Sequence, residues 1–184
     1  PGNQILCLFE DKESNIWIGT NGDGLCMLPG DHFAHYTTKS GLPNNKVQHI
    51  EQDAAGNYWL ASDGGGISVM NFSGNVPVFK TYTEKEGLSS NFTTSVAIGR
   101  SGNHNVWIGT ASQGIIKFDG QRFTCFKEED GLVNNRVNSL LVDSKGIVWC
   151  GTANGISRYD GIEFINFSTD MMKMSDQGVK VIIE

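Results

Sequence analysis

The stretch Asn15-Ile-Trp17-Ile-Gly-Thr20 decides the fold, because it recurs three more times along the chain. The copies are Asn57-Tyr-Trp59-Leu-Ala-Ser62, Asn105-Val-Trp107-Ile-Gly-Thr110 and Ile147-Val-Trp149-Cys-Gly-Thr152. The four tryptophans are separated by 42, 48 and 42 residues. A repeat of this length is typical of a four-stranded propeller blade. The sequence therefore predicts an all-β fold, a β-propeller with four blades of four-stranded antiparallel sheets.

A second landmark, a Gly-Leu pair, sets the boundaries of the repeats. It occurs at Gly41-Leu42, Gly87-Leu88 and Gly131-Leu132, and Lys173-Met174 takes its place in the fourth copy. The repeats are thus residues 1–42, 43–88, 89–132 and 133–174, and residues 175–184 begin a fifth. We expect the whole chain, 1–184, to be one β-propeller segment, a fragment of a larger propeller.

Each repeat contains four runs of β-branched and aromatic residues, separated by glycine, asparagine and aspartate, which predicts four short strands. A sheet of this kind has two apolar faces and cannot bury them alone, so neighbouring sheets must stack. We expect Trp17, Trp59, Trp107 and Trp149 to pack between blades, where each indole N–H requires an acceptor.

An aspartate begins the turn before the tryptophan in three repeats, as Asp11, Asp53 and Asp143. Aspartate is typical of tight turns because its side chain accepts hydrogen bonds from nearby backbone. A functional cluster of carboxylates is the alternative hypothesis. Repetition in successive blades favours the structural interpretation, because a functional site needs no copy in each blade.

Composition and charge exclude several classes of partner. The net charge is −6 and the 14 basic residues are scattered, which argues against nucleic acid. No apolar stretch approaches the roughly 20 residues that cross a bilayer, and the first residues resemble no signal peptide. We therefore expect a soluble, already trimmed segment without membrane contact.

The four cysteines, Cys7, Cys26, Cys125 and Cys150, show no Cys-x-x-Cys spacing, so we expect no zinc site and no cofactor. Cys150 takes the position of Ile18, Leu60 and Ile108 in the other repeats, which predicts a small buried apolar side chain. The sequence leaves the redox state of these cysteines open.

Departures from the repeat are the places where we look for a ligand site, because loops on a rigid scaffold vary freely. The second repeat has about four extra residues around Phe72, and the third has two near Asn103 and His104. These three residues are the candidate ligand-binding residues. The alternative for each is an ordinary solvated loop side chain.

The motif Val-x-x-Ile-x-x-Asp-x-x-Gly-Asn-x-Trp, which here runs from Val47 to Trp59, resembles the two-component regulator propeller repeat. The resemblance also includes Gly65-Gly66-Ile67 and Gly41-Leu-Pro-Asn44, and it extends over essentially the whole chain. This sequence departs from the motif at Gly99, which replaces the aspartate, at Ile147, which replaces the asparagine, and at Lys173-Met174.

The resemblance implies a periplasmic sensor region of a bacterial hybrid two-component system. It further implies an oligosaccharide ligand, a histidine kinase outside this chain, and further blades and downstream domains as partners. No catalytic residue is expected in this segment. Two alternatives remain open, namely a glycan-active propeller enzyme, either a lyase or a hydrolase, and a non-catalytic structural or adhesion module.

A piece of a propeller exposes the edges of its first and last blades. Exposed strand edges and apolar faces favour association. We therefore expect self-association of this segment, or closure of its four blades into a ring. The identity of the ligand and the number of blades in the parent are left open by the sequence.

Overall fold

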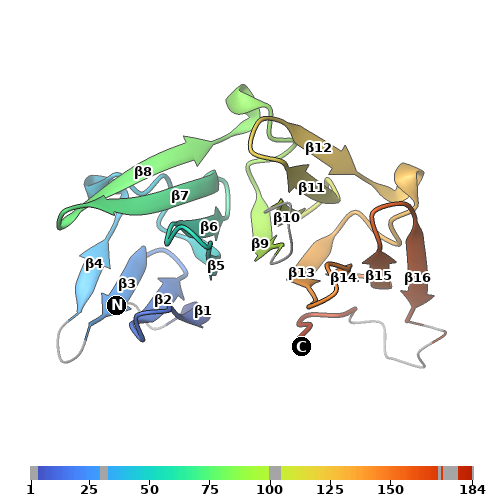
Figure 1. Ribbon diagram of the computed structural model, residues 1–184, viewed down its shortest axis with the longest axis horizontal. Helices are drawn as coiled ribbons and strands as arrows, with labels where there is room; N and C mark the ends of the chain where they lie inside the picture. The colour runs from blue at the N-terminus through green and yellow to red at the C-terminus, as the bar shows by residue number, and fades with distance from the viewer. Residues whose placement is uncertain (1–3, 30–32, 100–104, 170, 172–177, 184) are drawn as a thin grey trace. The chain divides into compact units, whose positions relative to one another are not determined.

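The computed structural model describes residues 4–29, 33–99, 105–169, 171 and 178–183. Within these ranges the chain forms sixteen strands and three 3-10 helices, so the fold is all-β. The strands form four antiparallel sheets of four strands, and in each sheet the strand order follows the chain (Figure 1). The predicted architecture of four-stranded blades is confirmed.

The chain divides into two compact units, Pro1–Glu86 with Asn91–Thr93, and Gly87–Ser90 with Thr94–Glu184. The first unit contains two sheets and two 3-10 helices. Its elements are β1 (Ile5–Glu10), β2 (Ile16–Thr20), β3 (Leu25–Leu28), β4 (Ala34–Tyr36), η1 (Thr38–Ser40), β5 (Val47–Gln52), β6 (Tyr58–Ser62), β7 (Gly66–Ser73), β8 (Val76–Tyr82) and η2 (Glu84–Glu86).

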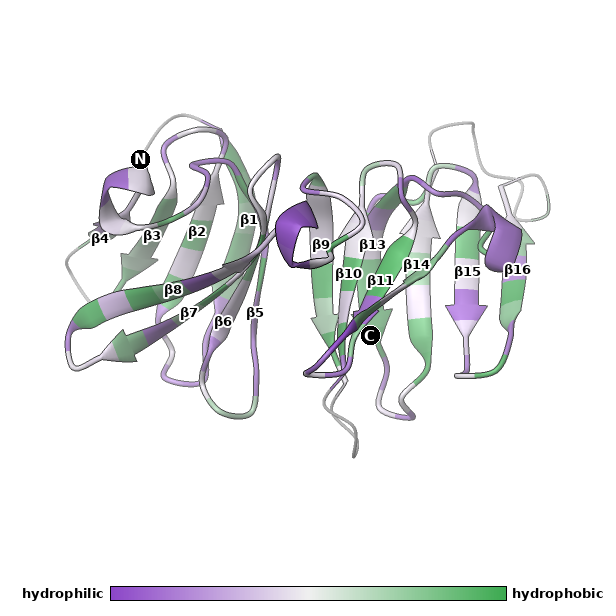
Figure 2. Ribbon diagram, turned by 90° about the horizontal axis from the view of Figure 1, so that it is seen from above, coloured by the Kyte–Doolittle hydropathy of each residue, from purple (hydrophilic) through white to green (hydrophobic). Residues whose placement is uncertain are grey.

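The second unit repeats this pattern with two further sheets. Its elements are β9 (Thr93–Ile98), β10 (Val106–Thr110), β11 (Ile115–Phe118), β12 (Phe123–Phe126), η3 (Glu128–Asp130), β13 (Val137–Val142), β14 (Val148–Thr152), β15 (Gly155–Tyr159) and β16 (Phe164–Ser168). Strongly hydrophobic segments lie within strands such as β1, β11 and β13 (Figure 2).

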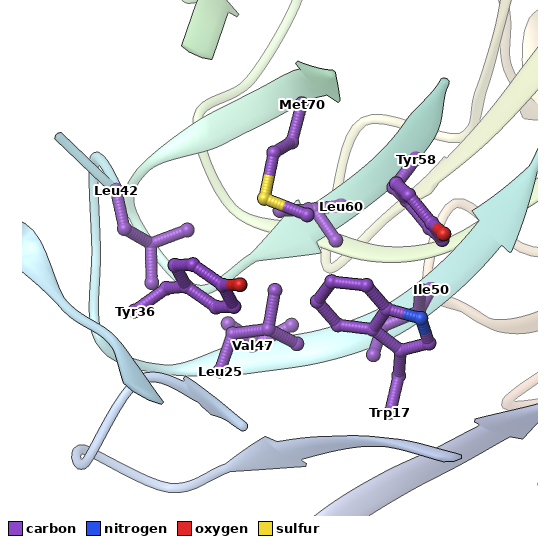
Figure 3. Close-up of a cluster of buried hydrophobic side chains, with 9 residues drawn as sticks. All are labelled: Trp17, Leu25, Tyr36, Leu42, Val47, Ile50, Tyr58, Leu60 and Met70. Atoms are coloured by element: carbon purple, nitrogen blue, oxygen red, sulfur yellow. The ribbon is translucent and has the colours of Figure 1, made fainter. Parts of the chain in front are cut away.

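The core of the first unit lies between its two sheets, as Figure 3 shows. Trp17 on β2 is fully buried, and its ring centroid lies 4.5 Å from that of Tyr58 on β6. Aromatic side chains bury about 150–250 Å² each, which contributes about 4–6 kcal/mol at roughly 25 cal/mol per Å². The cluster consists of Trp17, Leu25, Tyr36, Leu42, Val47, Ile50, Tyr58, Leu60 and Met70.

The second unit has a corresponding core around Trp107. The Trp107 ring lies 5.9 Å from Phe126 and 5.6 Å from Tyr159, measured between centroids. Tyr159 belongs to β15 of the next sheet, so aromatic contacts again join neighbouring sheets. The cluster consists of Ala97, Trp107, Ile115, Leu132, Val137, Leu140, Val142, Val148 and Cys150.

A glycine on the second strand of three sheets allows close approach of the first strand of the next repeat. A Cβ at Gly19 would lie 2.7 Å from the Val47 carbonyl oxygen, and a Cβ at Gly109 would lie 2.9 Å from Val137 Cγ1. Val179 Cγ1 lies 2.9 Å from the same position at Gly151. Residues 178–183 thus pack against the fourth sheet as β5 and β13 pack against the sheets that precede them.

All four cysteines are free thiols. Cys150 on β14 has no exposed surface, and burial raises its pKa to about 12. It packs among the apolar residues of the second core.

Candidate functional site

A carboxylate–indole hydrogen bond closes the first hairpin in three of the four sheets. The Trp17 indole N–H donates to Asp11 Oδ2 over 2.7 Å, Trp59 donates to Asp53 over 3.1 Å, and Trp149 donates to Asp143 over 2.9 Å. We call each of these three an Asp–Trp pair. The other carboxylate oxygen of each aspartate accepts backbone N–H groups of the turn.

These hydrogen bonds keep the three carboxylates charged. Burial alone would raise the pKa of Asp11, but the donors Trp17, Asn15 and Tyr58 outweigh it and lower the pKa below the ordinary 3.8. The same balance lowers the pKa of Asp53 and of Asp143. A buried carboxylate that accepts several hydrogen bonds favours its ionised form.

The pair in the first sheet has an additional donor from the second sheet. The Tyr58 hydroxyl donates to Asp11 Oδ2 over 2.8 Å, and burial raises the pKa of this tyrosine further above its ordinary range. Asp11 therefore joins two sheets as well as closing its own turn. Sequence reasoning identified the turn role of the aspartates but missed that they are the indole acceptors.

The third sheet lacks the Asp–Trp pair because Gly99 replaces the aspartate. Trp107 is only 5% exposed, and no described residue accepts a hydrogen bond from its indole N–H. A cavity of about 350 Å³ opens beside it, which we call the Trp107 cavity. Its lining residues are Gly99, Asn105, Trp107, Lys117, Val142, Lys145, Gly146, Val148, Tyr159, Asp160 and Gly161.

The corresponding place in the first unit is filled by three side chains. Asp11 accepts from Trp17, Tyr58 adds its phenol ring, and Phe72 on β7 packs 6.5 Å from the Trp17 ring. At the equivalent positions of the second unit stand residues with smaller side chains, which are Gly99, Val148 and Gly161. The cavity therefore results from three substitutions that coincide in space.

The Trp107 cavity is polar and carries two amino groups. Lys117 Nζ lies 5.8 Å from the Trp107 ring centroid, and Lys145 projects from the β13–β14 turn. Within the described part of the chain, neither lysine forms an ion pair with a carboxylate. Lys117 is thus available to an anion, whereas Lys145 also attracts the Asp143 carboxylate and helps to lower the pKa of that group.

The one carboxylate of the described lining, Asp160, is already engaged. Its Oδ1 accepts the backbone N–H groups of Ile162 and Glu163, and its Oδ2 lies 3.8 Å from Arg158 Nη1. The backbone hydrogen bonds lower the pKa of Asp160. The neighbouring Tyr159 hydroxyl donates to the Gly161 carbonyl oxygen over 3.0 Å, and burial raises its pKa.

Of the sequence-predicted candidates, Phe72 is described and does not line this cavity. Phe72 is 38% exposed and packs against Trp17, Tyr36 and Tyr58 in the first unit. Asn103 and His104 lie outside the described residues. The residues of the Trp107 cavity were missed, although the departure at Gly99 was a signal for them.

Among the described residues, no group of three or more His, Cys, Asp or Glu side chains is placed to hold a metal ion. Among the same residues, no helix has the length and apolar character needed to span a bilayer.

Comparison with known proteins follows the repeats. Residues 1–22, 41–64 and 131–154 match the family model described as two component regulator propeller. The extracellular domain of a hybrid two-component system from B. thetaiotaomicron is 26% identical, with a TM-score of 0.80 over 95% of this chain and 24% of that chain. Histidine kinase P4 from Formosa agariphila is 29% identical over 84% of this chain and 12% of its own length.

A further solved structure agrees in fold alone. Virginiamycin B lyase from Staphylococcus aureus is 16% identical, with a TM-score of 0.71 over 91% of this chain and 56% of that chain. The four sheets are therefore blades of a β-propeller. More narrowly, the matched residues of three repeats are similar to the two-component regulator propeller repeat, and the chain spans only 12% and 24% of the two relatives named above.

Proposed function

We propose that this chain is a ligand-sensing segment in the periplasmic part of a hybrid two-component receptor. In this proposal it recognises an oligosaccharide, and the signal passes to a histidine kinase that this sequence does not contain. One observation carries the proposal, the 26% identity along 95% of the chain with the extracellular domain of a hybrid two-component system.

The chemistry of the Trp107 cavity supports binding rather than turnover. Hydrolysis of a glycoside commonly requires two carboxyl groups, one of them with a raised pKa. Asp160 is the single carboxylate in the described lining, and its pKa is lowered by backbone hydrogen bonds. A group held as the anion in this way is a poor general acid.

The test is isothermal titration calorimetry of the 184-residue chain against a panel of neutral and acidic oligosaccharides. Each mixture is afterwards analysed by mass spectrometry for cleavage or elimination products. Saturable binding with the oligosaccharide recovered intact supports the sensor. Catalytic conversion of any member of the panel contradicts it and favours the enzyme alternative, and absence of binding across the panel favours the structural module.

We further propose that another blade covers the first strand of the first sheet. Ile5 and Leu8 on β1 are 57% and 66% exposed, whereas their equivalents on β5, Val47 and Ile50, are buried against the first sheet. The relatives are several times longer than this chain, which supplies the candidate blades. Isolated, the segment is expected to self-associate through this strand.

Multi-angle light scattering tests the association. The expected result is a mass above that of one 20.1 kDa chain, with a shift to the monomer when Leu8 is changed to lysine. Changing the exposed Ile162 to lysine is the matched control, because this residue lies in the β15–β16 hairpin of the second unit and is not part of β1. A monomeric wild-type chain at high concentration would contradict the proposal.

A further inference from the structure

We propose that the Trp107 cavity binds the carboxylate of a small organic acid, and that this carboxylate occupies the place that the Asp11 side chain holds in the first sheet. The inference rests on the chemistry of the cavity itself. It names a ligand class for this cavity and does not depend on the proposed recognition of an oligosaccharide.

The donors that hold a carboxylate in the first sheet are also present in the third. Asn15 donates its side-chain N–H to both Asp11 oxygens, over 3.2 and 3.0 Å, and Trp17 donates its indole N–H. Asn105 and Trp107 stand at the equivalent positions, and both line the cavity. The third repeat thus keeps two donors and lacks their acceptor.

One backbone hydrogen bond beside these donors is also preserved. The Gly99 N–H donates to the Asn105 carbonyl oxygen over 2.9 Å, as Asp11 does to Asn15 over 3.0 Å. The hairpin is therefore closed by the same hydrogen bond with and without the aspartate. An external carboxylate would meet donors that are already in position, which lowers the cost of ordering them.

Charge at the cavity favours an anion. Lys117 and Lys145 both line it, without an ion pair to a described carboxylate, while both oxygens of Asp160 are engaged. In the first unit an apolar residue, Met27, stands at the position of Lys117. Two ammonium groups and an indole N–H form a combination that stabilises a negative charge.

The size of the cavity restricts the ligand to a small molecule. A volume of about 350 Å³ lies at the lower end of the range for small-molecule sites. Two sources of a carboxylate fit this size, a sugar acid and an aliphatic hydroxy acid. The polar lining favours hydroxyl groups beside the carboxylate in either case.

A single substitution supplies the carboxylate internally. Gly99 is not in the left-handed region, and a Cβ there would meet its nearest atoms, Asn105 O and N, at 3.4 and 3.7 Å. Aspartate can therefore replace glycine without strain. The variant Gly99→Asp is expected to form an Asp–Trp pair with Trp107 and to compete with any ligand carboxylate.

The experiment is calorimetric titration of the wild-type chain and its variants with D-galacturonate, L-malate and, as the uncharged match, D-galactose. We expect at least one of the two acids to bind, with galactose at least about tenfold weaker. Gly99→Asp should weaken acid binding at least about tenfold and raise the urea midpoint of unfolding. Lys117→Met should weaken acid binding and reduce its salt dependence.

The control variant is Lys80→Met, in the first unit. Lys80 Nζ lies 4.8 Å from the Tyr82 ring centroid, and neither residue lines the cavity, so this change removes a similar cation–ring contact without touching the lining. It should leave acid binding unchanged.

Several results would overturn the inference. The inference fails if neither acid binds, if galactose binds as well as galacturonate, or if Gly99→Asp binds the acid as the wild type does. Neutral oligosaccharides that bind wild type and Gly99→Asp equally would leave the proposed sensor intact, so the two proposals fail separately. Binding of malate alone or of galacturonate alone identifies the source of the carboxylate.

Discussion

Removal of the Asp11 carboxylate should be one of the most costly single changes in the first unit. The side chain accepts from the Trp17 indole over 2.7 Å and from the Tyr58 hydroxyl over 2.8 Å. Trp17 is fully buried and Tyr58 is 6% exposed, so Asp11→Ala leaves two buried donors without an acceptor. Each such donor costs about 1–3 kcal/mol, which gives a total of about 2–6 kcal/mol.

Asp143 provides the matched comparison in the second unit. It accepts one side-chain donor, the Trp149 indole, over 2.9 Å, and both residues are half-buried. Water can therefore reach the indole N–H after Asp143→Ala, and we expect a cost of about 1–2 kcal/mol. The backbone hydrogen bonds of the two turns are equivalent, so the difference reports burial, the tyrosine and the Asn15 side chain, whose place is taken by Ile147 in the second unit.

Urea unfolding followed by tryptophan fluorescence measures the free energy of unfolding of both variants. Asp11→Ala should lose at least about 1 kcal/mol more than Asp143→Ala. In the Tyr58→Phe background the cost of Asp11→Ala should fall, because one donor is already absent. Equal costs for the two aspartates, or no coupling to Tyr58, would refute this account of the Asp–Trp pair.

Three further predictions concern packing, thiol chemistry and acid. Gly109→Ala should lower the free energy of unfolding, measured in urea, by about 1–3 kcal/mol, because the new Cβ would lie 2.9 Å from Val137 Cγ1. An unchanged urea midpoint would show that the sheets can separate without penalty. Burial raises the pKa of Cys7 and Cys150 to about 12, so a thiol reagent at pH 8 should modify both only upon unfolding. Mass spectrometry maps the labelled cysteines. Fast labelling of Cys150 in the native chain would contradict this prediction. The aspartates of the Asp–Trp pairs have lowered pKa values, so their contribution to stability is complete above the ordinary 3.8 and is lost as the pH falls through the lowered native values. The stability advantage of the wild type over Asp11→Asn should therefore shrink below pH 3.8. A constant advantage down to pH 2 would contradict this prediction.

The strands and their grouping into sheets could be predicted from the sequence because the signals are local and repeated. The Trp17 stretch and its three copies mark the second strand of each sheet, and the Gly-Leu pair marks the end of each repeat. Turn chemistry at Asp11 is equally local, since its backbone partners lie within four residues. Patterns of this kind require no knowledge of how one sheet packs on the next.

The polar contacts between sheets could not be predicted in the same way. Tyr58 reaches Asp11 across 47 positions of sequence, and it is the only hydroxyl-bearing residue at its place in the repeat, where Ile16, Val106 and Val148 stand otherwise. Phe72 drew attention as an aromatic residue in a long hairpin. Its packing against Trp17 follows from the stacking of two sheets, which the repeat pattern does not specify at the level of single side chains.

The Trp107 cavity shows how an ordinary-looking departure acquires a chemical consequence only in three dimensions. Gly99 deprives the Trp107 indole N–H of the carboxylate acceptor that Asp11 gives to Trp17, and this N–H is not among the buried polar atoms of the described residues that lack a partner. Apolar side chains that closed the space would bury the donor without a partner, which costs about 1–3 kcal/mol, whereas an open polar space admits an acceptor from outside. Val148 and Gly161 keep the space open and Lys117 makes it polar. The packing of the second unit therefore leaves room for an external acceptor to replace the missing aspartate.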